Sequence, residues 1–367
     1  MNPASVFSDD YAAARDRFRR AAAKLGWHLE ARAIDATGPS GEALAMDVGV
    51  SPGGDPERVL VVSSGVHGVE GFFGSAAQVA LLERWATSKL PETKCVFVHG
   101  VNPYGFAWLR RFDENNVDPN RNFLLPGESF EGAPDIYAKL DRFLNPQRPP
   151  SAWEPVKLKS ACFIARYGIP ALRQAIAGGQ YDFPKGLFFG GFEPSQSQKL
   201  LAENVPRWLM GSKRVVHLDF HTGLGKQAAC KLLIDYPLPD HLRSWLTDWY
   251  GRDAFEASDV SGIAYQARGG FGRWCVSKAF APDYLFACAE FGTYDSVKVL
   301  IGLRAENQAH HWGTVGSPST MKAKLSLKEL FCPASQSWRA AVVERSVELV
   351  VRAERGLIEL GLPKAMS

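Results

Sequence analysis

Two short apolar segments separated by a glycine-rich loop constrain the fold of this chain more than any other feature. Residues 58–63 (RVLVVS) and 94–98 (KCVFV) are continuous apolar runs, which indicate strands buried on both faces of a sheet. A glycine-rich loop at 65–71 and a helix-like segment at 72–87 separate them. This order predicts a βαβ unit, and therefore a parallel or mixed sheet with helices on its faces.

Later segments extend the same pattern. Residues 214–220 (RVVHLDF) and 284–290 (YLFACAE) predict two more buried strands, and the alternating residues 43–49 predict another. Helical spacing of apolar residues predicts helices over 9–25 and 334–361, the second of which would cover a face of the sheet. We therefore predict an α/β fold, with a mixed, mostly parallel twisted sheet flanked by helices.

A long segment at 124–212 interrupts this alternation. It is rich in proline, glycine and glutamine, and has a helical piece near 159–177. We interpret it as an insertion over one edge of the sheet, because its apolar residues are too scattered along the chain to form a second core. The whole chain, 1–367, is accordingly predicted to be a single domain.

Composition excludes several classes of function. The 42 basic and 39 acidic residues nearly balance, which leaves no electrostatic footprint for nucleic acid. The charged N-terminus lacks the apolar stretch of a secretory signal, and no segment has the roughly 18 apolar residues that span a bilayer. The six cysteines are scattered without a CxxC pair, which favours reduced thiols in a cytoplasmic protein. Any metal must then be held by histidine and carboxylate.

Such side chains gather where the predicted strands end. His67 and Glu70 follow the first buried strand in SSGVHGVEGFFG, Asp219 and His221 stand in DFHTGLG, and Glu290 stands in ACAEFGTY. Ligands of open α/β sheets bind outside the carboxyl ends of the strands. Catalytic zinc takes three such ligands and keeps a fourth position open. We therefore predict a zinc site on His67, Glu70 and His221, with Asp219 behind a ligating histidine and Glu290 as the general base.

Each of these residues alone has a simpler interpretation, and only their co-occurrence in order supports a site. His217 lies about 13 Å along the strand from His221, too far to share an ion, and is interpreted as a packing residue. His99 is also interpreted as structural, and His310 and His311 lie in a predicted late loop with no useful pattern. A literal GxSxG at 49–53 does not predict a serine hydrolase, because Pro52 forbids the required turn.

The order of motifs resembles a known family. HxxE is followed by NPYGF, an arginine-rich stretch, DPNRNF, a histidine after a strand and EFGT. This order resembles the zinc carboxypeptidase superfamily, which includes the aspartoacylase and succinylglutamate desuccinylase branch, and it looks most like a bacterial branch of that superfamily. The likeness covers roughly residues 58–125 and 181–295.

The resemblance implies a single catalytic domain of that fold with one Zn²⁺ on His67, Glu70 and His221. It also implies that Glu290 acts as general base and acid.

The resemblance assigns the substrate-binding residues as well. Asn120 and Arg121 match the Asn-Arg pair that binds the terminal carboxylate of the substrate, and Arg111, or else Arg110, matches the arginine that polarises the scissile carbonyl. Tyr265 lies at the right distance before the general base to match the family's tyrosine, but in a different sequence context.

The implied activity is hydrolysis of an amide bond next to a carboxylate-bearing residue, with a metallocarboxypeptidase acting on peptides as the first candidate. The alternative is a deacylase acting on small acylated amino acids. A non-catalytic binding protein on the same fold would have lost a ligand or the general base, and none is lost here. The sequence is also compatible with a homo-oligomer.

Overall fold

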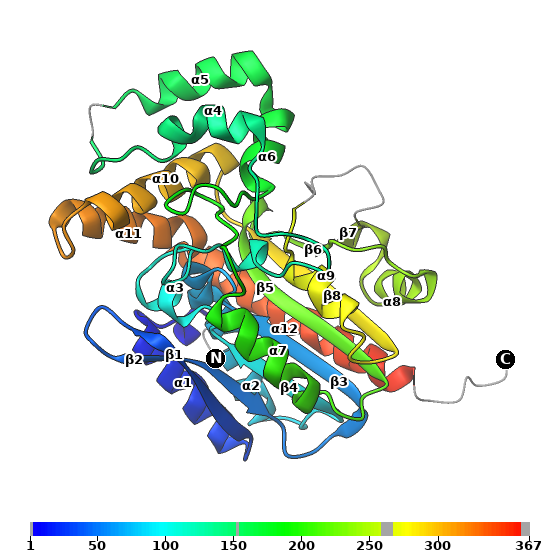
Figure 1. Cartoon of the computed structure of the whole chain (residues 1–367). Coiled ribbons are helices and arrows are strands. Elements are labelled where there is room, and N and C mark those ends of the chain that lie inside the picture. The colour runs from blue at the N-terminus through cyan, green and yellow to red at the C-terminus, as the bar shows by residue number, and fades with distance from the viewer. Residues whose placement is uncertain (1–2, 152–153, 258–266, 361–367) are drawn as a thin grey trace.

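An eight-stranded mixed sheet forms the centre of the molecule in the computed structural model, which describes residues 3–151, 154–257 and 267–360 (Figure 1). The four central strands, β4, β3, β5 and β8, are parallel, and antiparallel pairs join β2 and β6 to them. The predicted mixed, mostly parallel sheet is confirmed. The strands in spatial order are β1 (His28–Thr37), β2 (Ala43–Val50), β4 (Thr93–His99), β3 (Asp55–Ser64), β5 (Arg214–Gln227), β8 (Asp283–Gly292), β6 (Cys230–Ile234) and β7 (Phe255–Ala257).

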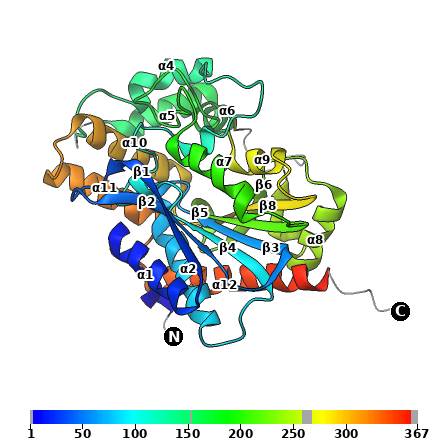
Figure 2. The same cartoon turned by 60° about the horizontal axis from the view of Figure 1, so that its bottom comes forward.

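Helices cover both faces of this sheet. Helices α1 (Tyr11–Lys24), α2 (Gly71–Trp85) and α12 (Gln336–Glu359) lie on one side, and α7 (Gln196–Trp208) lies on the other (Figure 2). Their apolar side chains and those of the strands form the main hydrophobic cluster. The C-terminal helix covers the sheet as the sequence predicts, since it packs against β3, β4 and β5.

The last helix of the segment between β4 and β5 differs from its prediction. This helix, α7, buries Leu201 and Val205 in the main cluster, so it belongs to the body of the fold rather than to an insertion. The earlier helices α4 (Asp135–Leu144), α5 (Val156–Tyr167) and α6 (Ile169–Ala177) lie together in space (Figure 1).

These helices share a second hydrophobic cluster with α10 (Ser296–Trp312) and α11 (Pro318–Phe331). The expectation that the apolar residues of 124–212 are too scattered to form a core is therefore wrong. Residues distant in sequence converge in space, because partners for α4 and α6 come from the C-terminal third of the chain. Members of the cluster include Val69, Tyr137, Leu140, Leu172, Ile176, Phe188, Val299, Leu303 and Phe331.

The remaining elements are shorter. They are η1 (Pro3–Val6), η2 (Gly68–Glu70), α3 (Pro103–Ala107), η3 (Pro119–Arg121), α8 (Asp240–Tyr250), η4 (Arg252–Ala254) and α9 (Phe271–Ser277). His310 and His311 lie in the last turn of α10, which corrects their placement in a loop. All six cysteines are free. In the described part of the chain, no helix combines the length and apolar character needed to cross a bilayer.

Candidate metal centre

The loop after β3 carries both His67 and Glu70. Gly65 allows the chain to turn sharply with a φ of +69°. Gly68 then packs directly on the backbone of α3, where an added Cβ would come within 2.1 Å of the carbonyl carbon of Gly105. The short helix η2 follows, and α2 begins immediately after Glu70. A close backbone contact therefore fixes the loop that carries both side chains.

His221 and Glu290 come from the neighbouring strands β5 and β8. They stand opposite each other in the parallel register of these strands. Asp219 precedes His221 by two residues and therefore points to the same face of the sheet. The strands bring together three of the side chains that the sequence analysis singled out.

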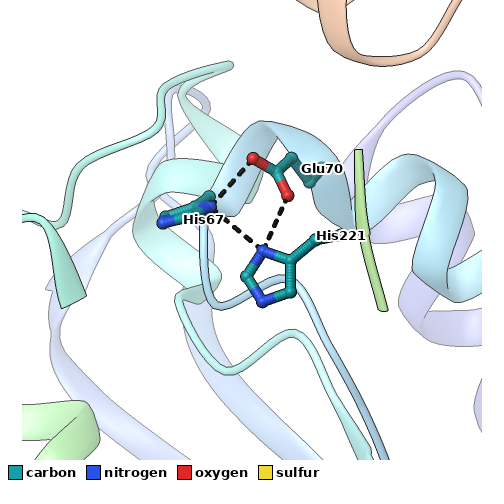
Figure 3. Close-up of side chains that lie close together, drawn as sticks. All are labelled: His67, Glu70 and His221. Carbon is teal, nitrogen blue, oxygen red and sulfur yellow. Dashed lines mark hydrogen bonds and ion pairs between the residues drawn. The ribbon is translucent and has the colours of Figure 1, made fainter. Parts of the chain in front are cut away.

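The side chains of His67, Glu70 and His221 turn their ligand atoms toward one another (Figure 3). His67 Nδ1 lies 2.8 Å from Glu70 Oε1, His221 Nδ1 lies 3.0 Å from Glu70 Oε2, and the two Nδ1 atoms are 3.2 Å apart. A tetrahedral zinc ion with bonds near 2.0–2.1 Å separates its ligands by about 3.3 Å. The described side chains thus fit a shared cation, since only a proton or a metal ion relieves two facing imidazole nitrogens.

A carboxylate stands behind each imidazole. His221 Nε2 lies 2.5 Å from Asp219 Oδ2, and His67 Nε2 lies 3.3 Å from Asp118 Oδ1, although without good hydrogen-bond alignment. Ser63 donates a second hydrogen bond to Asp219 at 2.5 Å. Carboxylates in this position orient ligating histidines with the opposite nitrogen toward the metal. Sequence reasoning identified Asp219 but missed Asp118, although Asp118 opens the DPNRNF motif.

The charges of the site are strongly coupled. Burial by itself raises the pKa of Glu70, but the neighbouring His67 and His221 outweigh it and hold this pKa well below the usual value. Burial lowers the pKa of His221, yet Asp219 and Glu70 raise it well above the usual value. The trio is therefore an ionised carboxylate between two imidazoles in a buried position.

Glu290 occupies the other side of His221. It is buried, and Leu224 donates its backbone N–H to Glu290 Oε1 at 2.7 Å. Burial, together with the charge of Glu70, raises the pKa of Glu290 to about 7. A carboxyl group with this pKa exchanges a proton readily at neutral pH. Potential ligand atoms of His221, Cys288 and Glu290, one from each residue, also lie within 4.8 Å of one another. The sequence did not single out this cysteine.

The two candidate arginines have different surroundings. Arg111 lines the cavity, donates from Nε to Asp118 at 2.8 Å and has Nη1 3.7 Å from Glu70. Arg110 is fully buried and donates to Glu306 at 3.0 Å, away from the cavity lining. The geometry therefore favours Arg111 as the arginine beside the metal centre.

Asn120 and Arg121 line the same cavity. Asn120 accepts a hydrogen bond from the backbone of Phe271, and the Arg121 guanidinium donates to the carbonyl of Ala177 at the end of α6. The ring of Phe188 faces two guanidinium groups, and its centroid lies 5.2 Å from Arg111 Cζ and 5.9 Å from Arg121 Cζ. Its φ of +56° is unusual for a bulky residue.

Two other histidines have structural partners. His217 is buried between Ser63, at 2.7 Å, and Tyr284, at 2.9 Å, and it takes no part in the candidate metal group. His99 is buried beside Ser75 at 2.9 Å. Both interpretations as packing residues are confirmed. Tyr265 lies outside the described residues.

The side chains of the candidate site line one cavity with a volume of about 1040 Å³. One part of its wall carries the metal trio, Glu290, Arg111 and the Asn120–Arg121 pair. Another part is formed by α4, α5, α6 and α10.

Comparisons with known proteins agree with this architecture. A family model described as protein of unknown function (DUF2817) matches residues 7–345, and no curated protein matches the sequence. Bovine thrombin-activatable fibrinolysis inhibitor, solved with tick carboxypeptidase inhibitor, is similar in structure with a TM-score of 0.54 and 11% identity over 96% of this chain and 98% of that chain. This likeness shows a carboxypeptidase-like fold, as the sequence resemblance predicts.

Two further solved structures also match. Succinylglutamate desuccinylase from Chromobacterium violaceum has a TM-score of 0.37 and 13% identity, over 87% of this chain and 74% of that chain. An aspartoacylase family protein from Mesorhizobium loti has a TM-score of 0.36 and 13% identity, over 79% of this chain and 68% of that chain.

Proposed function

Because this chain belongs to the family described as protein of unknown function (DUF2817), we propose its activity from the chemistry of the site. The proposal is a zinc-dependent hydrolase that cleaves an amide bond next to a carboxylate-bearing residue. The observation that carries it is the convergence of His67 Nδ1, His221 Nδ1 and the Glu70 carboxylate, with Glu290 beside them. Two imidazoles and one carboxylate form a donor set of catalytic zinc sites.

The residues would divide the work as follows. His67, Glu70 and His221 would hold the ion, which when bound polarises a carbonyl and lowers the pKa of water. Glu290 would accept a proton from the attacking water and pass it to the leaving nitrogen, for which its pKa of about 7 is suited. Arg111, close to Glu70, would stabilise the negative charge that develops on the carbonyl oxygen.

Asn120 and Arg121 would hold the carboxylate of the substrate. A guanidinium binds a carboxylate through two parallel hydrogen bonds, and Arg121 would share its donors between this group and the backbone carbonyl of Ala177. We place a metallocarboxypeptidase acting on peptides first. Removal of an acyl group from a small acylated amino acid is the second candidate, and the apolar part of the cavity wall favours it.

Metal content and turnover test the proposal together. We expect one zinc ion per chain in protein purified without added metal, and hydrolysis of at least one member of a panel of short peptides and N-acyl amino acids. The Glu290→Gln variant should keep its zinc and lose about 10²- to 10⁴-fold in kcat. The His221→Ala variant should lose the zinc itself.

A matched control separates these effects from general damage. Glu193 is an exposed glutamate, so Glu193→Gln should leave zinc content and kcat unchanged. Full activity of Glu290→Gln would remove the general-base role. Zinc binding without turnover of any panel member, in a well-folded protein, would instead favour a binding protein on this fold.

A further inference from the structure

One part of the cavity wall beside the metal trio is mostly apolar. It is formed by side chains of α4, α5, α6 and α10, which belong to or pack against the second hydrophobic cluster. We call this part the apolar arm and define it by Phe143, Phe163, Ile164, Leu172, Ile176 and Leu300. Helices from two distant parts of the chain thus build a common apolar wall beside the site.

Few polar groups interrupt this wall. Among the described residues of these four helices that line the cavity, the polar ones are Ser160, Arg173, Ser296 and Arg304. The Arg304 guanidinium is buried and donates to Glu154 at 2.7 Å, so its charge is already balanced. The arm therefore offers apolar contact along most of its surface.

The arm is continuous with the reaction centre. The same cavity is lined by the metal trio and the Asn120–Arg121 pair, and Phe188 and Phe331 belong both to its wall and to the second cluster. Cavities for small ligands have volumes of about 300–1,000 Å³. At about 1040 Å³ this cavity exceeds what an acetylated amino acid fills.

Two exposed apolar side chains also line the cavity. Ile169 is 53% exposed and Val297 is 39% exposed, and both line the cavity. Both residues extend the apolar surface that α6 and α10 present to the cavity.

Resting on the second candidate for the proposed amide hydrolysis, removal of an acyl group, we propose that the substrate is an N-acyl amino acid whose acyl group is a long hydrocarbon chain, and that this chain occupies the apolar arm. The carboxylate of the amino acid binds at Asn120 and Arg121. Water adds its oxygen to the acyl carbon as the C–N bond breaks, and its proton goes to the nitrogen. The products are a fatty acid and a free amino acid.

A hydrocarbon chain suits this arm better than a peptide does. A peptide brings one N–H and one C=O per non-proline residue, and burying these groups without partners is costly. The arm has few side chains that would satisfy them. A hydrocarbon chain has no such groups and gains affinity with every methylene that it buries.

Binding measured apart from turnover tests the proposal. N-acylglycines with acyl chains of increasing length, from acetyl to dodecanoyl, are titrated calorimetrically into zinc-loaded Glu290→Gln protein, below their micelle concentrations. We expect roughly fourfold tighter binding per added methylene until the arm is filled. In the wild type, kcat/KM should rise over the same series.

Variants of the arm locate the chain. Leu300→Glu on α10 and Ile164→Glu on α5 change half-buried positions, and each should reduce the ratio of dodecanoyl to acetyl affinity by at least tenfold. Leu325 on α11 is 53% exposed and does not line the cavity, so Leu325→Glu should leave this ratio unchanged. Thermal unfolding of each variant checks its fold.

The outcomes separate the two proposals. Affinity independent of chain length, or tighter binding of an apolar tetrapeptide than of dodecanoylglycine, would overturn the assignment of the arm even if zinc and amidase activity are present. Length-dependent binding that is lost in the arm variants supports the arm, and absence of zinc or turnover in the same protein then counts against the hydrolase alone.

Discussion

Each imidazole of the candidate metal centre has a carboxylate on its outer nitrogen. Asp219 and Asp118 stand behind His221 and His67, so both Nδ1 atoms face inward. The neutral tautomer that a metal requires is the one with the proton on Nε2, and a carboxylate that accepts from this nitrogen, as Asp219 does for His221, stabilises it. The identity of the residue behind the histidine therefore affects metal affinity as well as orientation.

We expect Asp219→Ala to weaken zinc binding by about 10- to 100-fold, because the histidine loses its orienting acceptor. Competition with a chromophoric chelator measures the change. Asp16→Asn is the control, since Asp16 is exposed on α1. Unchanged zinc affinity in Asp219→Ala would show that the carboxylate does not support the ligand.

His99 gives the protein a dependence on pH that is separate from the metal centre. Burial lowers the pKa of His99 to about 4, whereas an unfolded histidine titrates near 6.5. Between these values the unfolded chain binds the proton and the folded chain does not. The free energy of unfolding should therefore decrease as the pH falls from 6.5 to 4, by up to about 3 kcal/mol from this residue.

Comparison with His99→Gln isolates that contribution. Denaturant unfolding at several pH values should show a shallower decrease for this variant than for the wild type. His28→Gln changes an exposed histidine and should keep the wild-type slope. Parallel curves for the wild type and His99→Gln would contradict the assignment.

Sequence reasoning identified residues whose chemistry follows from a motif. His67, Glu70, His221 and Glu290 belong to recognisable patterns at strand ends, and the structure brings them together. Phe188 could not be found in this way, because its role depends on a turn that places one ring below two arginines.

At the scale of elements, the buried parallel strands were the easiest to predict. Strands β3 and β4 carry continuous apolar runs, which few other structures accommodate. Strand β1 has only one buried residue, and β7 has three residues in all, so their sequences carry little periodic signal. The helices of the second cluster were obscured for another reason, since their apolar residues pack against partners far away in the sequence.

The loop that carries His67 and Glu70 depends on its contact with α3. In Gly68→Ala the new methyl group would lie 2.1 Å from the carbonyl carbon of Gly105, a backbone atom that cannot move cheaply. We expect a loss of stability of about 1–3 kcal/mol and weaker zinc binding. Thermal unfolding and chelator competition measure the two effects.

Gly53 supplies the control for this substitution. An added Cβ there meets no atom within 4 Å, so Gly53→Ala should change neither stability nor zinc affinity appreciably. Zinc binding by Gly68→Ala equal to that of the wild type would show that the loop tolerates displacement.

At the scale of the whole molecule, the two hydrophobic clusters differ in how deeply they are buried. Six consecutive residues of β3 are fully buried, whereas no described side chain of α5 is. Local opening is easiest where few apolar contacts must be broken. We expect amide hydrogens of α5 and α6 to exchange with solvent well before those of β3 and β5.

Hydrogen exchange followed by mass spectrometry tests this order. Addition of dodecanoylglycine to the zinc-loaded Glu290→Gln protein should slow exchange in α5 and α6 and leave the central strands unchanged. Equal protection of both clusters in the free protein would show that the molecule opens as a single unit.

The two walls of the cavity come from different segments of the chain, and this has a consequence for how the protein evolves. The loop after β3 and the strands β5 and β8 supply the metal trio and Glu290, while α4, α5 and α6 lie in one stretch of chain between η3 and α7. Mutation and recombination in that stretch can alter which molecules are accepted while the strands stay under purifying selection. Lineages carrying this fold are therefore expected to diverge fastest in α4–α6, and their substrates to diverge with it.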